Sequence, residues 1–192
     1  ERTDVSHYRL SLHLTLAFFI FSLLIWSYLK FNNNSLFDKK VLPANLPFFL
    51  TFLILLQISV GAFVSGLDAG QIYQTWPLMN GTYFPDDSKI NDLFNVESLE
   101  NPSIVQFFHR NLAYFILIVY SFILFLIFKH NDYNYLKKSA VVVLLALIFQ
   151  IVLGILTILS GATIYIASLH QIGSIFLITS SLILAFKNSR IS

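Results

Sequence analysis

Five long apolar runs dominate this sequence and restrict the folds open to it. Each is close to the roughly 20 predominantly apolar residues that a helix needs to cross a bilayer, and a helix satisfies its own backbone hydrogen bonds inside lipid. Of the 192 residues, 56% are hydrophobic and only 11% are charged, whereas about a quarter of the residues are charged in a typical soluble domain. We therefore predict an all-α, polytopic membrane protein. The expected transmembrane helices cover residues 10–29, 47–66, 104–128, 139–159 and 164–186.

Local signals mark where several of these helices begin and end. Pro47 opens the second apolar run and suits the first turn of a helix. Gly66 and Gly161 follow apolar runs, as helix-ending glycines do. Because only a few residues around Gly161 separate the fourth and fifth helices, those two should be antiparallel neighbours. We expect the last four helices to form an antiparallel four-helix bundle.

Basic residues gather on one side of this predicted topology. The long connection 67–103 has one lysine, Lys89, against six acidic residues. The connections at the opposite ends of the helices carry most of the positive charge: Lys30, Lys39, Lys40, Lys129, Lys137, Lys138, Lys187 and Arg190. The positive-inside rule assigns the basic side to the cytoplasm or the mitochondrial matrix, and the 67–103 loop to the outer side. A loop of this length is either functional or mobile.

The composition excludes several classes of function. The sequence has no cysteine, so it has no disulfide framework, thiolate metal site or cysteine nucleophile. Its net charge of +2 argues against nucleic-acid binding. The predicted helices contain no paired carboxylates, and the sequence shows neither a glycine-rich phosphate loop nor a Ser-His-Asp order.

Histidine and glutamine alternate along the five helices. The first, third and fifth each have a histidine a few residues inside the outer end, namely His13, His109 and His170. The second and fourth instead contain QISVG (57–61) and QIVLG (150–154), each a glutamine followed four residues later by a glycine. This alternation indicates a duplicated helical hairpin. All three histidine helices run from the outer side to the inner side, so their imidazoles should lie at a similar depth.

An ionisable side chain within a transmembrane helix indicates a functional site, because its burial in lipid is costly. Histidine is an axial ligand of haem iron, and helical bundles hold such cofactors in their cores. Two imidazoles on parallel helices could clamp a planar ligand between them. The alternative is that these histidines form interhelical hydrogen bonds that only aid packing.

Small residues near two of the histidines favour a flat ligand. Gly173 and Ser174 lie one helical turn beyond His170 and on the same face, and Ala113 holds a similar place beyond His109. Side chains this small would leave room for a macrocycle.

Two polar residues flank His109. Arg110 lies near the outer interface, where its guanidinium could pair with a carboxylate such as a haem propionate or reach lipid headgroups. Gln106 precedes His109 by three residues and shares its face. For Gln57 and Gln150 we favour helix packing over a role in orienting a ligating imidazole.

Three other polar residues lie outside this pattern. Asp68, at the end of the second helix, is either a cap or a functional acid. His7 precedes the first helix and His130 lies in a lysine-flanked connection, so we expect both to be solvated.

Four segments together resemble the heme A synthase family, most closely its proteobacterial and mitochondrial type: VSHYRLSLHL (5–14), GAFVSGLDAGQIYQTWPLMNGTYFP (61–85), ENPSIVQFFHRNLAY (100–114) and LHQIGSI (169–175). The similarity runs over nearly the whole chain. Members of that family have eight transmembrane helices in two similar halves. The resemblance implies that residues 1–46 are the fourth helix with a cytoplasmic loop, and that residues 47–192 are the C-terminal half with the outer loop 67–103. The chain has no initiator methionine, and we expect it to be a piece of a longer protein.

That family oxidises a methyl side chain of haem O to a formyl group, which gives haem A for cytochrome oxidase. The resemblance implies that His109 and His170 ligate the iron of haem b, with Arg110 and Gln106 at the same site, and that His13 is one ligand of the substrate haem O. The second ligand of haem O and a catalytic glutamate would lie upstream of this chain. Gln106 takes the place of that glutamate in this half, so we expect no certain catalytic residue here.

The resemblance also implies an oxidoreductase of the bacterial or mitochondrial inner membrane. Its partners would be the lipid bilayer, haem O, haem O synthase, cytochrome oxidase assembly factors and a second copy of the chain. We expect the 192-residue chain alone to bind haem b without making haem A. Two other functions stay open: a bis-histidine haem b electron carrier without side-chain chemistry, and a transporter or assembly factor whose histidines serve packing.

Overall fold

The computed structural model describes residues 6–32 and 42–189, and these form five long α-helices joined by short 3₁₀ turns and one long loop. All five are long and apolar enough to cross a membrane. The five predicted helices are confirmed, and most extend a few residues past the apolar run because polar ends continue the backbone hydrogen bonding. Their bounds are α1 His7–Asn32, α2 Leu46–Gly66, α3 Pro102–Lys129, α4 Lys137–Leu159 and α5 Ile164–Asn188.

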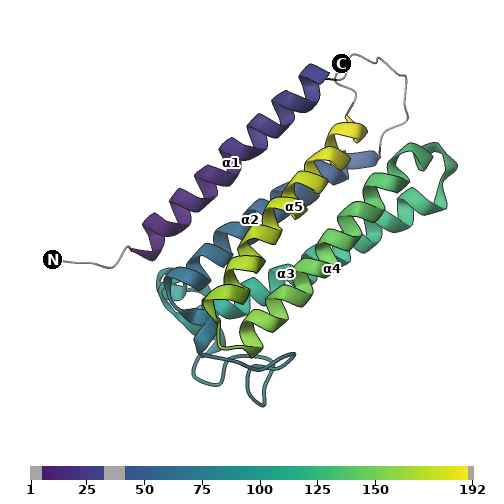
Figure 1. Ribbon diagram of the computed structural model, residues 1–192. Helices are drawn as coiled ribbons and strands as arrows, with labels where there is room; N and C mark the ends of the chain where they lie inside the picture. Colours follow the sequence, from purple (N-terminus) through teal and green to yellow (C-terminus); the bar gives the residue numbers. More distant parts are fainter. Residues whose placement is uncertain (1–5, 33–41, 190–192) are drawn as a thin grey trace.

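The last four helices form the predicted bundle. α2 packs against α3 and α5, and α4 packs against the same two helices, so α3 and α5 lie diagonally across it. α1 lies outside this bundle along α2 and α5. In Figure 1, α1 is at one side of the molecule and the α3–α4 hairpin at the other, with α2 and α5 between them. The chain is therefore a multi-pass membrane protein with one four-helix bundle and an additional helix.

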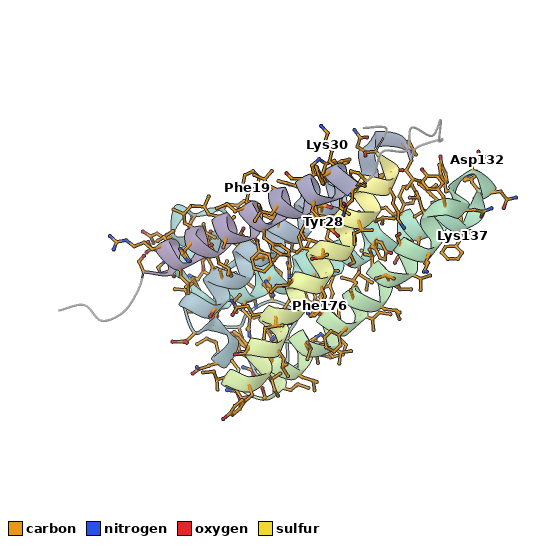
Figure 2. The ribbon with its side chains drawn as sticks, turned by 45° about the horizontal axis from the view of Figure 1, so that its top comes forward. Phe19, Tyr28, Lys30, Asp132, Lys137 and Phe176 are labelled. Atoms are coloured by element: carbon orange, nitrogen blue, oxygen red, sulfur yellow. The ribbon has the colours of Figure 1, made fainter. Side chains whose placement is uncertain are left out.

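The two ends of the bundle differ in character. Figure 2 labels Lys30, Asp132 and Lys137 at the end opposite the long loop 67–103. Lys39, Lys40 and Arg190, which belong to the predicted basic side, lie outside the described residues. Large apolar side chains on the outer helix surfaces face the surroundings, as labelled for Phe19 and Phe176, which are 51% and 66% exposed. Such exposure suits a lipid environment.

Most of the continuous apolar core lies in the basic half of the bundle. Its buried α3 residues are Ile116, Tyr120, Ile123 and Ile127. Tyr120 is fully buried and donates its hydroxyl to the carbonyl of Ala140. The core also includes Ile58 of α2, next to Gln57, so it reaches the polar layer where the histidines lie.

The helix ends follow local chemistry. Asn101 caps α3 by accepting hydrogen bonds from the backbone N–H groups of Ser103 (2.9 Å) and Ile104 (3.3 Å), and a proline follows it at the first helical position. Gly161 has φ +67°, the left-handed conformation expected of a helix-ending glycine. α2 ends at Gly66, as expected, and this glycine also permits close approach of α1, because a Cβ there would lie 2.8 Å from the Cβ of His7.

Candidate functional site

His109 lies on α3 with its ring against the backbone of α2. The nearest ring atom, Cε1, would be 3.0 Å from a Cβ placed on Gly61. Gln57, one turn before that glycine, places its Nε2 3.2 Å from the ring Nε2 of His109 and donates to the backbone carbonyl of His109 at 3.0 Å. The ring Nδ1 is buried and has no hydrogen-bond partner.

His170 lies on α5 in a matching arrangement against α4. Its Cε1 would be 3.2 Å from a Cβ placed on Gly154. The amide orientation that satisfies Gln150 has its nitrogen donating to the carbonyl of His170 at 3.1 Å and its oxygen accepting from the backbone N–H of Ser174 at 3.2 Å. The ring Nδ1 of His170 is also buried without a hydrogen-bond partner.

These two sets of contacts confirm the predicted repeat in three dimensions. In each half, a glutamine reaches the main-chain carbonyl of a histidine on the following helix, and the glycine four residues later faces that imidazole. The interhelical contacts that we favoured for Gln57 are present, and its amide also lies against the imidazole of His109. The hydrogen bonds of Gln150 are to the backbone of His170 and Ser174.

The predicted use of Gly173 is also wrong. A Cβ at Gly173 would lie only 1.9 Å from an end atom of the Gln150 side-chain amide, so the space beside this glycine is filled by that amide and not left for a ligand. Ser174 turns its hydroxyl to the carbonyl of Gln171 (2.6 Å). Ala113 is half-buried on α3, and the room expected there stays a prediction.

The two imidazoles lie at the same level of the bundle. His109 comes seven residues after the start of α3 and His170 six after the start of α5, and both helices run in the same direction. At about 1.5 Å rise per residue, both rings lie about 10 Å inside their helix ends.

This donor set fits haem better than a bare metal ion. Within the described residues, no group of three or more His, Cys, Asp or Glu side chains could hold a metal ion. Haem needs only two protein ligands, because the porphyrin supplies the others. The buried Nδ1 atoms of His109 and His170 show that neither imidazole has its hydrogen-bonding capacity met by the protein.

Arg110 and Gln106 have partners that the sequence did not predict. The Arg110 guanidinium donates from Nη1 to the carbonyl of Thr75 and from Nη2 to the carbonyl of Tyr73, each at 3.0 Å. Gln106 donates from Nε2 to the same Tyr73 carbonyl at 3.0 Å. Both side chains are buried, at 7% and 2% exposed. The guanidinium thus holds the backbone of the outer loop, while its buried Nε has no hydrogen-bond partner, so the expected pairing with a propionate stays a prediction.

The outer loop is an ordered structure built around Tyr73 and Asp87. The Tyr73 hydroxyl donates to Asp86 Oδ1 at 2.6 Å, and burial together with that bond raises the pKa of Tyr73 to about 12. Ser103, at the start of α3, donates to Asp87 Oδ2 at 2.6 Å. Burial alone would raise the pKa of Asp87, but hydrogen bonds from Ser103, Ser88 and Tyr73 lower it below its usual value. The sequence left open whether this loop is functional or mobile, and these hydrogen bonds do not fit a mobile loop.

The remaining predicted residues lie apart from the histidine pair. His13 is exposed on α1, away from Ser11 and Thr15, which hydrogen-bond to α2. Asp68 is exposed and makes no side-chain cap bond, so the cap interpretation is not supported. His130 is exposed as expected.

The prediction that His7 is solvated is wrong. Its ring is half-buried at the junction of α1 and α2, and Nε2 is buried without a hydrogen-bond partner. The ring packs near Phe63, with centroids 5.9 Å apart. Gly66 lets His7 come close to α2, because it has no side chain in the way. The sequence contains this glycine, but its role could be recognised only once the α1–α2 contact was known.

Comparison with known proteins gives consistent matches over almost the whole chain. Residues 1–182 match the protein family described as cytochrome oxidase assembly protein. The chain is 45% identical over 190 residues to a heme A synthase of Pelagibacter ubique, which covers 98% of the chain and 55% of that protein. It is 39% identical over 184 residues to a heme A synthase of Wolbachia pipientis, covering 94% of the chain and 51% of that protein. A heme A synthase of Rickettsia felis is 36% identical over 182 residues, with 92% and 53% covered.

The chain spans about half the length of the curated relatives it matches. No solved structure matches it at a comparable level of significance.

Proposed function

The chain belongs to the cytochrome oxidase assembly protein family, and on that premise we propose that it is the C-terminal part of a heme A synthase. That enzyme is an oxidoreductase which converts a methyl side chain of haem O to a formyl group, giving haem A for cytochrome oxidase. The proposal rests on the similarity to proteins named heme A synthase and on one structural observation. That observation is the pair of matching histidine environments on α3 and α5 at one depth of the bundle.

In this proposal, His109 and His170 ligate the iron of haem b from opposite sides of the bundle. Haem b, when bound, supplies one-electron chemistry. The protein's own contribution is to fix the two imidazoles and to cover the outer end of the site. Arg110 and Gln106 perform the second task by holding the Tyr73 carbonyl, and with it the outer loop, on α3.

His13 would serve the other half of the enzyme. Its exposed position on α1 leaves the imidazole available to helices upstream of this chain. We propose that it is one ligand of the substrate haem O, with the second ligand and the catalytic glutamate on those helices. Accordingly, this chain alone binds haem b and makes no haem A.

The proposed location is a bacterial or mitochondrial inner membrane, with the lysine-rich end on the cytoplasmic or matrix side. The proposed partners are haem O, haem O synthase, cytochrome oxidase assembly factors and a second copy of the chain. The loop 67–103 then faces the outer compartment.

A reduced-minus-oxidised absorption spectrum of the purified, haem-supplied chain tests the haem b site. We expect a six-coordinate haem b signal in the wild type that is lost in both His109→Ala and His170→Ala. His130→Ala is the matched control, because His130 is exposed, and it should keep the signal. A folded wild type without a haem spectrum would refute the proposed site, and a signal that survives both substitutions would refute the ligand assignment.

A further inference from the structure

We infer that Gln57 and Gln150 are positioning residues that, with Gly61 and Gly154, set the planes of the two ligating imidazoles. This inference rests on the proposed function, because it assigns how that haem b site is held in shape. It goes beyond the ligands themselves to the residues that decide their orientation.

The first argument is the cost of a buried amide inside a membrane. Gln150 is 7% exposed and Gln57 is half-buried, and both lie in the middle of transmembrane helices. A polar group in that environment is unfavourable unless it is hydrogen-bonded. Each glutamine meets this requirement for its amide NH₂ with the same partner, the backbone carbonyl of a histidine on the next helix, whereas the Gln57 Oε1 is buried without a partner. The bond therefore fixes the height of the histidine relative to the glutamine helix.

The second argument is the fit of each imidazole against a glycine. A Cβ on Gly61 or Gly154 would come within 3.0 Å or 3.2 Å of the ring Cε1 atom of His109 or His170. At distances this short, a methyl group there would require the ring to shift by a few tenths of an ångström. The glycine thus lets the imidazole lie directly on the neighbouring helix backbone, which limits its rotation from that side.

The third argument is that the two halves reach the same result with different secondary contacts. Gln57 also places its amide nitrogen 3.2 Å from the imidazole Nε2 of His109, a contact that ligation of iron through this Nε2 would break. Gln150 instead spans the His170 carbonyl and the Ser174 N–H, which are one helical turn apart. The α2–α3 and α4–α5 pairs share two features: the hydrogen bond from the glutamine to the histidine carbonyl, and the contact between the glycine and the imidazole. Chance packing would not be expected to repeat both.

Fixing two imidazoles fixes the angle between their planes. In a low-spin ferric haem that angle influences the electron paramagnetic resonance g values, and hydrogen bonding to a ligand imidazole influences the reduction potential. A merely structural glutamine would change how much protein folds, but it would not change these two properties in the protein that does fold.

The experiment uses the purified, haem-loaded chain and four single variants. Gln57→Met and Gln150→Met remove each amide at nearly constant volume, and Gly61→Ala and Gly154→Ala push on each ring. Loss of a partner around a metal ligand typically weakens metal binding about 10–100-fold, and we expect this loss of haem affinity in the methionine variants. We expect the alanine variants to retain haem with shifted g values and a shifted midpoint potential. Thr51→Val is the matched control.

The control removes an interhelical hydrogen bond from the same helix as Gln57. Thr51 bonds the Ser181 hydroxyl at 2.7 Å and contacts neither histidine. Thr51→Val should therefore leave the haem affinity, the g values and the midpoint potential unchanged. Wild-type affinity, g values and potential in the methionine and alanine variants would overturn the inference while the haem b site stands. If a methionine variant does not fold, the alanine variant in the same helix decides the question for that half. Absence of haem from the folded wild type would instead refute the proposed function.

Discussion

Replacing Arg110 with methionine should release the outer loop from α3. The guanidinium holds the carbonyls of Thr75 and Tyr73, and it is almost fully buried beneath the loop. Methionine keeps much of the apolar stem and removes both hydrogen bonds. The same helix face retains Gln106, which still donates to the Tyr73 carbonyl at 3.0 Å.

The size of the effect follows from these contacts. A hydrogen bond from a charged group contributes about 1.5–3 kcal/mol. Two such bonds are lost, but Gln106 keeps the Tyr73 carbonyl satisfied, so we expect the loop to open more easily by about 2–4 kcal/mol. Since 1.4 kcal/mol is a factor of ten, backbone amides protected by the loop should exchange about 30–700-fold faster with solvent.

The shared carbonyl also predicts that the two side chains are not independent. Gln106→Leu alone leaves Arg110 on the Tyr73 carbonyl, whereas the double variant leaves that buried carbonyl without a donor. An orphaned buried acceptor costs about 1–3 kcal/mol, so the double variant should lose about this much more than the sum of the two single variants.

Amide hydrogen exchange on the purified protein measures both quantities. The most direct probes are Met79, whose N–H donates to the Thr82 carbonyl at 2.7 Å, and Asn80, whose N–H donates to the Thr75 hydroxyl at 2.8 Å. Arg9→Met is the control, because Arg9 is exposed on α1. Unchanged exchange at these amides in Arg110→Met would refute the idea that Arg110 anchors the loop. If the free-energy loss of the double variant equals the sum of the losses of the two single variants, the shared acceptor is refuted.

Two further predictions concern the outer end of the molecule. Hydrogen bonds keep the pKa of Asp87 in the folded protein below its usual value of 3.8, so the carboxylate stabilises the fold fully above pH 3.8 and loses this effect as the pH falls through its folded pKa. Protease cleavage of the loop should therefore rise only in acid. Ser103→Ala should move that rise to higher pH, since it removes a hydrogen bond that lowers the pKa of Asp87. A Ser103→Ala protein with the wild-type acid profile would contradict this account. Gly161→Ala places a side chain on a residue with φ +67°, which should lower the free energy of unfolding by about 1–2 kcal/mol. Thermal unfolding measures this loss. Gly81→Ala is the control, because an added Cβ there meets nothing within 4 Å.

The helices and the histidine pairing could be predicted from the sequence because each depends on a repeated, local signal. Runs of apolar residues reveal a transmembrane helix independently of its neighbours. The order of histidine and glutamine helices gave the depth of His109 and His170, and the Gln-to-Gly spacing marked Gly61 and Gly154. The structure adds that these glycines face the imidazoles.

The partners of Arg110 could not be predicted, because they are backbone carbonyls. A carbonyl is present at every residue, so Tyr73 and Thr75 carry no distinguishing signal in the sequence. A propionate oxygen and a carbonyl oxygen both accept from a guanidinium, so the sequence alone could not show that two loop carbonyls take part of its donors. The prediction for Gly173 was wrong for a related reason. Small residues create space, but the sequence does not show that the Gln150 side chain fills it.

The adjacency of His109 and Arg110 now has a geometric explanation. Consecutive residues of an α-helix point about 100° apart, so one position of α3 turns its imidazole to α2 while the next turns its guanidinium to the outer loop. A single rigid turn of helix therefore carries both the proposed haem ligand and the anchor of the loop that covers it. Any displacement of the loop that pulls on Arg110 acts on the same turn that holds His109. A lysine at 110, with one ammonium in place of a planar fork, could not hold both carbonyls in the same geometry.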